Sequence, residues 1–417
     1  MAITGNGGDA GAGLALHGRS SPRAISSDVR RHNLSVIARL LATDGPKSRS
    51  GLAKAAGLTR GAVTALSSAL IDAGVIREVT PTPQPGTKGR PNTLLALAAD
   101  RAALLVLQLD ADRATALAAN VAGETIFRIE ERHHRPMGDP DRILDVLAGV
   151  LERALAECAK RKRTVSDLTV ITFAPVGGDP VVVLADTDLD WGEVDVLGGL
   201  RNRVPAMPEA RLTSDAAVAA VAELGLLGRI DDALYLKSNS GIGGAAVSGG
   251  RVVTGTNGMA GAFGHIPIDH DGALCACGQR GCLVTVAGPD AILEAAGMQT
   301  VRDRDGLTTA LYEFAQRIER GDREASAAWS TASSWIAHAL WVLTLSFDPQ
   351  IVVLGGYWSS LTDSIDREFK RGGPAILGAG SYEPPAVVAG RLGSDAALVG
   401  AVWAARERVL DDPLSLP

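Results

Sequence analysis

Three of the four cysteines lie within eight residues, and this cluster constrains the fold more than any other feature of the sequence. Cys275, Cys277 and Cys282 follow His265 at intervals of 10, 12 and 17 residues, and two glycines between the last two cysteines let the chain turn back on itself. Three thiolates and one imidazole complete the tetrahedral shell of a structural zinc site. A disulfide between Cys275 and Cys277 would be strained. We therefore predict that these four residues bind zinc in a reducing compartment.

The composition is typical of a folded chain, with 46% hydrophobic and 21% charged residues. A length of 417 residues predicts two or three domains. The longest apolar stretch, Trp335 to Phe347, has 13 residues, and a membrane span needs about 20. Residues 1–20 are rich in glycine and alanine and lack the pattern of a signal peptide. We expect a cytoplasmic protein with no membrane partner and a disordered tail over residues 1–24.

Charge is divided unevenly along the chain. Residues 21–100 hold 11 basic and 5 acidic residues, a net charge of +6, whereas residues 101–417 hold 29 basic and 41 acidic residues, a net charge of -12. A basic module before an acidic body indicates a local site for a polyanion. The same asymmetry can also arise by chance between two solvated surfaces.

The basic segment has the spacing of a helix-turn-helix. We expect helices over Asp28–Thr43, over residues 50–56, and from an N-cap at Thr59 to about Ala73, where Gly74 ends the helix. Ala53 lets two helices cross closely, and Gly57 permits a sharp turn between them. The short or cationic residues that would face a DNA major groove are Ser50, Thr59, Arg60, Gly61, Thr64 and Ser67.

Two short strands, Val75–Ile76 and Leu94–Leu97, flank a loop from Pro81 to Pro91 that carries Lys88 and Arg90 near its tip. A hairpin in this place is a wing, and its cationic tip fits the phosphate backbone or a minor groove. Residues 25–97 are therefore predicted to form a winged helix-turn-helix domain that binds double-stranded DNA. The alternative is an ordinary helical hairpin used for dimerisation.

The rest of the chain, residues 98–417, alternates strand and helix patterns, which predicts an α/β fold with largely parallel sheets in two lobes around a cleft. The expected strands are Ala103–Leu109, Leu168–Ala174, Ala233–Lys237 and Ile351–Leu354, and the expected helices are Ile143–Ala159, Ala216–Leu227 and Ala325–Leu345. Glycines at Gly241–Gly244 and Gly355–Gly356 follow two of these strands and mark cleft candidates. A tight turn with no ligand is the alternative at each place.

These motifs together resemble the ROK family (repressor, open reading frame, kinase) over about residues 28–412. The resemblance rests on Gly255–His265, on the Cys-x-Cys-Gly-x-x-Gly-Cys pattern of Cys275–Cys282, and on Asp348–Gly356. It implies a two-lobed actin-like ATPase (ribonuclease-H-like) fold with a sugar between the lobes and the zinc site in the distal lobe. It also implies a homodimer or homotetramer. Kinase members lack the N-terminal helix-turn-helix that regulators carry.

The chain departs from the kinase pattern at several positions. The phosphate loop Asp-x-Gly-Gly-Thr is replaced by Asp110–Ala114, which has no glycine, and the Asn-Asp pair becomes Ser214–Asp215, which keeps only the catalytic-base position. Two glutamates of the family pattern are Ala262 and Val284 here. A sugar site that loses paired polar groups loses about 1–3 kcal/mol for each buried group left unpaired. We therefore predict no phosphotransfer and a protein that is not an enzyme.

The resulting prediction is a sequence-specific DNA-binding regulator, a repressor, whose ROK domain senses a small molecule, a carbohydrate or a derivative of one. The predicted effector-binding residues are Ser214, Asp215, Gly241, Asn257, Gly261 and His265. One alternative is a ROK-type sugar kinase with an appended helical module. Another is a regulator that has lost its effector.

Overall fold

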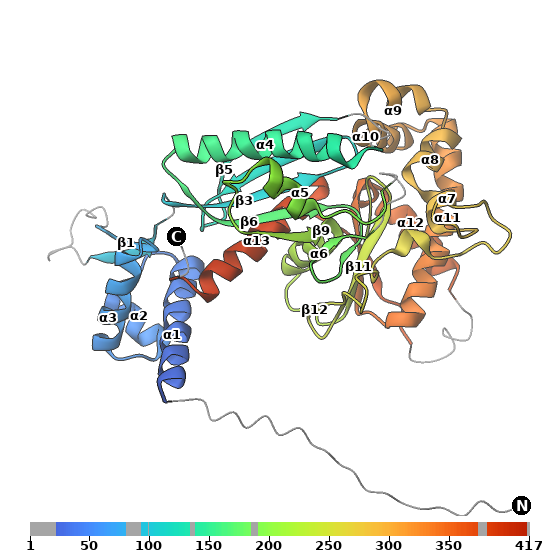
Figure 1. Cartoon of the computed structure of the whole chain (residues 1–417). Coiled ribbons are helices and arrows are strands. Elements are labelled where there is room, and N and C mark those ends of the chain that lie inside the picture. Colours follow the sequence, from blue (N-terminus) through green and yellow to red (C-terminus); the bar gives the residue numbers. More distant parts are fainter. Residues whose placement is uncertain are drawn as a thin grey trace, which may run out of the picture. The chain divides into compact units, whose positions relative to one another are not determined.

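A computed structural model describes residues 22–80, 93–98, 100–133, 138–184, 191–373 and 382–414 (Figure 1). The chain divides into two compact units. The first runs to Ala96 and includes Asp411–Leu414, and the second runs from Leu97 to Leu410. Lys88 and Arg90 of the predicted wing, and the predicted tail up to residue 21, lie outside the described residues.

The first unit contains three helices and a two-stranded sheet, formed by α1 (Pro22–Asp44), α2 (Arg49–Ala56), α3 (Arg60–Asp72), β1 (Ile76–Val79) and β2 (Leu94–Leu97). Helix α2 begins where the Ser48 side chain accepts the N–H of Gly51, and it ends at Gly57, which has a left-handed φ of 66°. The Thr59 side chain then accepts the N–H of Ala62 and begins α3, as predicted. The helices therefore begin and end where their capping residues can satisfy free backbone groups.

The residues predicted to face DNA differ in exposure. Ser50, Thr59, Arg60, Gly61 and Thr64 are exposed. Ser67 is completely buried, so the prediction that it faces outward is wrong. It lies four residues after Val63 and three before Leu70, both buried, and this spacing places it on the inner face of α3.

The first sheet of the second unit has the order β5-β4-β3-β6-β9. Its strands are β3 (Ala102–Leu109), β4 (Arg113–Ala119), β5 (Thr125–Arg132), β6 (Thr164–Thr172) and β9 (Ala210–Ser214). Strands β3, β6 and β9 are parallel, whereas β3-β4 and β4-β5 are antiparallel. The carboxyl ends of β3, β6 and β9 therefore meet at one edge of the sheet.

The second sheet has the order β12-β11-β10-β13-β14. Its strands are β10 (Ala233–Ser238), β11 (Ile242–Ser248), β12 (Arg251–Val252), β13 (Ile351–Gly356) and β14 (Ala386–Ala389). Here β10, β13 and β14 are parallel, and β10, β11 and β12 are antiparallel. The prediction of largely parallel sheets is thus wrong in part: both sheets are mixed, because hairpins with short connections form half of each.

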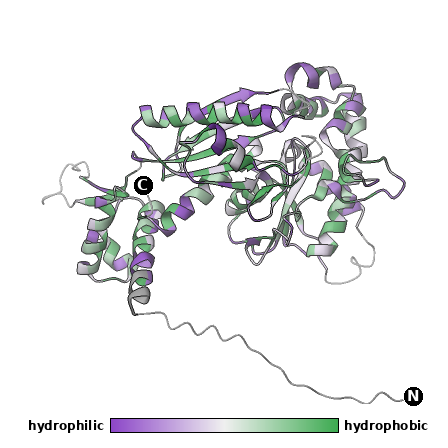
Figure 2. Ribbon diagram, in the orientation of Figure 1, coloured by the Kyte–Doolittle hydropathy of each residue, from purple (hydrophilic) through white to green (hydrophobic). Residues whose placement is uncertain are grey.

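Three apolar clusters pack these sheets. Alternate residues of β3 enter different clusters: Leu105 and Leu107 pack with α4 (Pro140–Lys160) and α5 (Val196–Arg203), and Leu104 and Val106 face the opposite way. The cluster that contains Leu104 joins both sheets with α6 (Asp215–Gly225) and α13 (Ala396–Asp411). Figure 2 shows hydrophobic residues along the strands and hydrophilic ones on the outer side of α4. Because β3 is buried on both faces, its amino-acid sequence is a nearly continuous apolar run.

The third cluster covers the other face of the second sheet. It contains residues of α7 (Leu283–Ala287), α8 (Pro289–Ala295), α10 (Leu307–Glu319), α11 (Arg323–Phe347) and α12 (Thr362–Arg371). Beside it lies the short helix α9 (Gln299–Asp305), and a small hairpin is formed by β7 (Val176–Gly177) and β8 (Val182–Val183). Within the described part of the chain, no helix combines the length and the apolar character needed to cross a bilayer.

Candidate functional site

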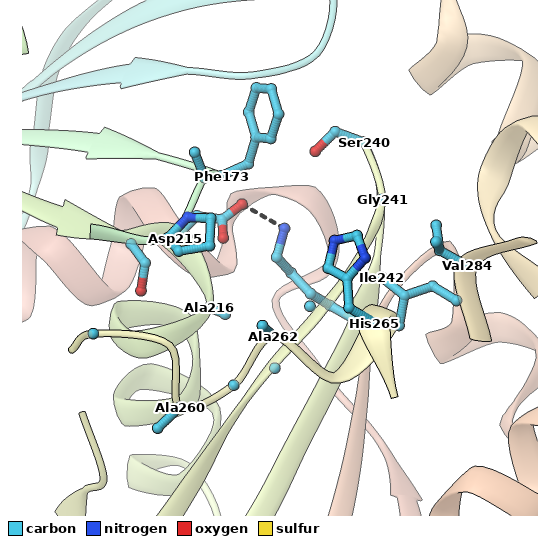
Figure 3. Close-up of a pocket in the computed structure, with 18 residues that line it drawn as sticks. Phe173, Asp215, Ala216, Ser240, Gly241, Ile242, Ala260, Ala262, His265 and Val284 are labelled. Atoms are coloured by element: carbon cyan, nitrogen blue, oxygen red, sulfur yellow. Dashed lines mark hydrogen bonds and ion pairs between the residues drawn. The ribbon is translucent and has the colours of Figure 1, made fainter. Parts of the chain in front are cut away.

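A pocket in the second unit brings together five of the six predicted effector residues (Figure 3). Ser214 and Asp215 enter it at the junction of β9 and α6, and Gly241, Gly261 and His265 come from the turn before β11 and from the loop after β12. Asn257 is exposed and does not line the pocket. The full lining is Phe173, Ala174, Pro175, Ser214, Asp215, Ala216, Lys237, Ser240, Gly241, Ile242, Gly243, Gly244, Gly258, Ala260, Gly261, Ala262, His265 and Val284.

Two glycines of this pocket are explained by close packing of backbone. A Cβ on Gly244 would lie 2.3 Å from the carbonyl oxygen of Tyr235. Gly261 has a φ of 102°, and a Cβ there would meet the Gly244 carbonyl oxygen. The Gly244 N–H donates in turn to the Gly261 carbonyl at 3.0 Å. These glycines let the loop before His265 lie directly against β11, which positions His265 at the pocket.

A buried ion pair lies at the base of the pocket. The Lys237 ammonium, on β10, contacts Asp215 Oδ2 at the start of α6, and Figure 3 draws this contact as a dashed line. The side chains of Lys237 and Asp215 are only 7% and 5% exposed. The pair therefore links the second sheet to the end of the first.

Lys237 was not among the predicted site residues. The signal that could have identified it is a single charge inside the apolar run Ala233–Ser238, because a lysine buried in a strand needs a partner. The partner could not be named from the sequence, since β10 and Asp215 meet only in the folded chain.

The segment after β3 is held by contacts within the protein. Asp110 follows β3, at the sheet edge where Asp215 follows β9. Burial raises the pKa of Asp110, and the Lys237 charge opposes this rise. The Asp112 carboxylate accepts the N–H and the O–H of Thr308, at 3.4 and 3.3 Å, in the first turn of α10. The segment that replaces the glycine-containing phosphate loop thus binds a helix N-terminus with its own carboxylate.

Apolar side chains also line the pocket. Ala262 and Val284, the residues that stand where the family pattern has glutamates, both line it. Phe173, Pro175 and Ile242 add further apolar surface. The pocket therefore combines a buried ion pair with apolar side chains, and Figure 3 shows Phe173 beside Asp215 and Val284 beyond the His265 ring.

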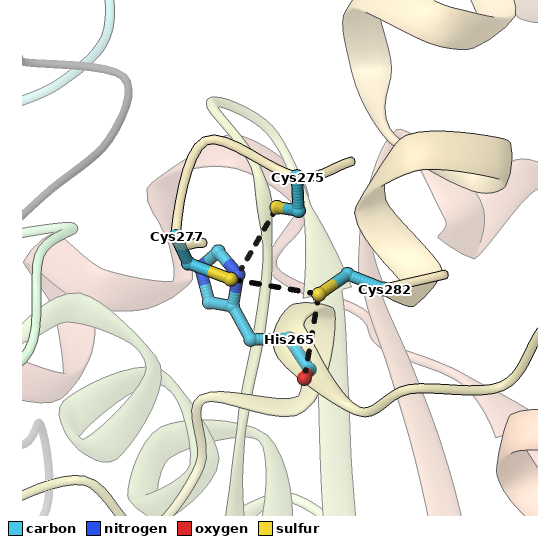
Figure 4. Close-up of side chains that lie close together, drawn as sticks. All are labelled: His265, Cys275, Cys277 and Cys282. Atoms are coloured by element: carbon cyan, nitrogen blue, oxygen red, sulfur yellow. Dashed lines mark hydrogen bonds between the residues drawn. The ribbon is translucent and has the colours of Figure 1, made fainter. Parts of the chain in front are cut away.

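The predicted metal ligands come together. One ligand atom from each of His265, Cys275, Cys277 and Cys282 lies within 4.8 Å of all the others. Cys275 Sγ lies 3.7 Å from His265 Nδ1, and Cys277 Sγ lies 3.6 Å from Cys282 Sγ (Figure 4). Burial lowers the pKa of His265, which favours the neutral imidazole that a metal binds. These four side chains could hold a metal ion.

Comparison with known proteins identifies the family. The model of the ROK family matches residues 113–408, more than half of the chain. The chain belongs to the ROK family. The two-sheet fold of its second unit is the mixed α/β, actin-like fold of ROK proteins.

Several ROK relatives are sugar kinases. The chain is 29% identical over 210 residues to an N-acetylmannosamine kinase of Haemophilus influenzae, and these residues are 48% of this chain and 65% of that kinase. It is 32% identical over 147 residues to an N-acetylmannosamine kinase of Yersinia pestis, covering 35% of this chain and 48% of that kinase. The chain thus spans less than two thirds of the length of either relative.

Two solved structures share the fold. The crystal structure of a ROK family transcriptional regulator, a homologue of the E. coli MLC protein, has a TM-score of 0.71 at 24% identity and covers 93% of this chain and 98% of its own. A ROK family glucokinase from Streptomyces griseus, in complex with glucose and AMPPNP, has a TM-score of 0.58 at 22% identity and covers 73% of this chain and 99% of its own.

The kinase relatives correct one prediction. The prediction that the chain is not an enzyme is contradicted by relatives named N-acetylmannosamine kinase and by solved ROK sugar kinases. It rested on the replaced phosphate loop Asp110–Ala114 and on changes at single positions, among them Ala262 and Val284, all within a fold that the kinases share.

Proposed function

We propose that this ROK protein is a DNA-binding transcriptional regulator, a repressor, whose ROK domain (residues 98–417) binds a small effector, a carbohydrate or a derivative of one. Residues 25–97 then form a winged helix-turn-helix domain that binds double-stranded operator DNA. A homodimer or homotetramer in the cytoplasm would present such domains in pairs to the two halves of an operator.

The extent of the structural match carries this proposal. The ROK regulator covers 93% of the chain, whereas the glucokinase covers 73%. The residues before the ROK match include α1 to α3 and the β1-β2 sheet. On α3 and its cap, Thr59, Arg60 and Thr64 are exposed. An exposed cation and hydroxyls at the start of a second helix are suited to contact phosphates and base edges in a major groove.

The test is capture of genomic DNA fragments by the full-length protein at moderate salt, followed by sequencing. We expect a few discrete sites that share an inverted repeat. Binding to such a site is then measured by fluorescence anisotropy for Arg60→Ala and Thr64→Ala. The matched control is Arg229→Ala, which removes an equal charge from a side chain of the second unit that is 90% exposed.

We expect Arg60→Ala to weaken specific binding by about 1–3 kcal/mol if it contacts a base, and Arg229→Ala to leave binding unchanged. Diffuse retention of DNA that salt abolishes would contradict sequence-specific regulation. Equal operator binding by the parent and both α3 variants would contradict the assignment of α3 as the recognition helix.

The metal in this proposal is structural zinc. In a tetrahedral shell with Zn–S about 2.3 Å and Zn–N about 2.0–2.1 Å, neighbouring ligand atoms lie roughly 3.5–3.8 Å apart. The separations of 3.7 Å between Cys275 and His265 and of 3.6 Å between Cys277 and Cys282 fit this shell. With four protein ligands, no position remains open for catalysis. Zinc would hold His265 and the loop before it in place beside the pocket.

Effector binding in this proposal acts through the two sheets. Ser214 and Asp215 follow the first sheet, whereas Gly241, Gly261 and His265 belong to the second sheet and the loop after it. A ligand that contacts both groups favours one arrangement of the lobes, and this preference is the coupling that would change operator affinity.

A second candidate function is sugar phosphorylation, favoured by the sequence similarity to N-acetylmannosamine kinases. Asp215 would accept the proton of the sugar hydroxyl that attacks the γ-phosphate of ATP, and ADP would leave. The test measures ADP formation from ATP with N-acetylmannosamine and other hexoses. Turnover by the parent that Asp215→Asn abolishes would support a kinase, and turnover equal in both proteins would exclude Asp215 as the base.

A further inference from the structure

The Lys237–Asp215 ion pair leaves specific hydrogen-bonding groups unused. The ammonium donates to Asp215 Oδ2. Within the described part of the chain, Asp215 Oδ1 and the two other protons of Lys237 have no hydrogen-bond partner. Both side chains line the pocket and are more than nine-tenths buried. A bound ligand therefore meets one acceptor and two donors at this end of the pocket.

The charges around the pair disfavour an ionised ligand group. The ammonium and the Asp215 carboxylate already compensate each other. A ligand anion would lie beside Asp215, with Asp110 also close, and a ligand cation would lie beside Lys237. In a buried site, repulsion between like charges is strong and water screens it little. The group that binds at the pair is therefore neutral.

Among neutral groups, a hydroxyl matches both partners. It accepts a hydrogen bond from Lys237 and donates one to Asp215 Oδ1. A carbonyl or ether oxygen would leave the Asp215 oxygen unpaired, and an unpaired buried acceptor weakens binding. Without Lys237, the site would offer a ligand only the hydrogen-bond acceptor of the carboxylate. The lysine adds the requirement that the bound group also accepts a hydrogen bond.

The far side of the pocket selects a different kind of group. Figure 3 shows Val284 on the opposite side of the His265 ring from Asp215. The Val284 side chain presents methyl groups and no acceptor. A polar group that faced them would lose its hydrogen bonds to water, whereas an apolar substituent would gain by burial.

We propose that Lys237 is a specificity-determining residue that, together with Asp215, binds one hydroxyl of a neutral polyhydroxylated ligand whose apolar substituent faces Val284. The inference rests on the proposed ligand-binding role of the ROK domain. It does not depend on DNA binding, and the experiment below contains no DNA.

The experiment is isothermal titration calorimetry of the full-length protein with two series of sugars. One series is D-glucose, N-acetyl-D-glucosamine, D-glucosamine and D-glucuronate, and the other is D-mannose, N-acetyl-D-mannosamine and D-mannosamine. Within each series the sugars differ by carrying a hydroxyl, an N-acetyl group with its apolar methyl, or a charged group. We expect the tightest binding for an N-acetyl sugar, weaker binding for the hexose and the weakest for the charged sugars.

The variants are Lys237→Met and the double variant Lys237→Met/Asp215→Asn, which removes both charges and so avoids an uncompensated buried carboxylate. We expect both to bind the preferred sugar about tenfold more weakly or worse. Lys370→Met is the matched control, because Lys370 is a lysine with a side chain 63% exposed on α12, outside the pocket lining.

Three results would overturn the proposal. These are no binding of any sugar in either series, an amino sugar or uronate that binds as tightly as its neutral counterpart, and parent-like affinity in the double variant. A failure of operator binding leaves these readouts unaffected, so the DNA-binding part of the proposed function and this inference fail separately. Sugar binding that the double variant leaves unchanged would overturn this inference while effector binding stands.

Discussion

The Lys237–Asp215 pair makes a quantitative prediction about stability. Both side chains are at most 7% exposed. Replacement of Lys237 by Met keeps an unbranched side chain of similar length but leaves the Asp215 carboxylate buried without the Lys237 counter-charge. Removal of one partner from a buried ion pair costs about 3–5 kcal/mol. Lys237→Met is therefore expected to lower the free energy of unfolding of the second unit by that amount.

The exposed pair Lys370–Asp366 provides the comparison. The Lys370 side chain is 63% exposed, and an exposed pair contributes about 0–1 kcal/mol. Lys370→Met is thus expected to change stability by less than about 1 kcal/mol. The double variant Lys237→Met/Asp215→Asn removes both charges of the pair and is expected to recover more than half of the loss of Lys237→Met.

Urea unfolding followed by tryptophan fluorescence measures these differences in the second unit alone. All six tryptophans lie between residues 191 and 403, within that unit. Equal slopes of the unfolding curves for parent and variants would show that stability, and not compactness, has changed. A loss below about 1 kcal/mol for Lys237→Met would refute the reasoning, because a pair that weak behaves as an exposed pair does. A double variant less stable than Lys237→Met would refute it as well.

Three further predictions concern other parts of the ROK domain. Cys277→Ser is expected to lose stoichiometric zinc by elemental analysis, while Cys158→Ser, at a buried cysteine outside the metal group, keeps it; a parent protein that contains no zinc would contradict the site. Burial raises the pKa of Asp110 above its ordinary 3.8, so the folded state holds this proton more tightly than the unfolded chain. Ionisation of Asp110 therefore lowers stability as the pH rises from about 4 toward neutrality. Asp110→Asn should flatten this part of the profile of urea midpoint against pH, and an unchanged profile would contradict the assignment. A Cβ on Gly400 would lie 1.9 Å from a carbonyl oxygen of α6, so Gly400→Ala should cost about 1–3 kcal/mol or more. Gly149 in α4 has no neighbour within 4 Å of such a Cβ, so Gly149→Ala should be neutral or stabilising; equal stability of the two variants would exclude close packing at Gly400.

Local features of the chain were predictable from the sequence. Thr59 was predicted to cap α3, and Gly57 was predicted at the turn between α2 and α3, since each residue acts on backbone groups within a few positions. The grouping of the four candidate metal ligands was predictable for a related reason. Three of them lie within eight residues, and the pattern of thiolates and imidazole is specific to metal binding.

Errors arose where the inward or outward direction of a side chain depended on distant neighbours. Ser67 is short and polar, which indicates an outer face, but the packing of α3 turns it inward. Asn257 lies within a stretch that matches the family pattern, yet its position in the loop keeps it outside the pocket lining. The composition and spacing of residues along one helix or loop do not show which of its faces the rest of the chain covers.

The sequence by itself determined the Thr59 cap and the Gly57 turn of the first unit, the grouping of the four candidate metal ligands and the membership of an α/β class, because each depends on residues close in the chain or on periodicity. Only the tertiary structure decided that both sheets are mixed, that Lys237 meets Asp215, and that Asp112 holds the start of α10. These contacts join residues 22 and 196 positions apart. Their existence depends on how the two sheets and α10 pack against one another, and no local pattern encodes that arrangement.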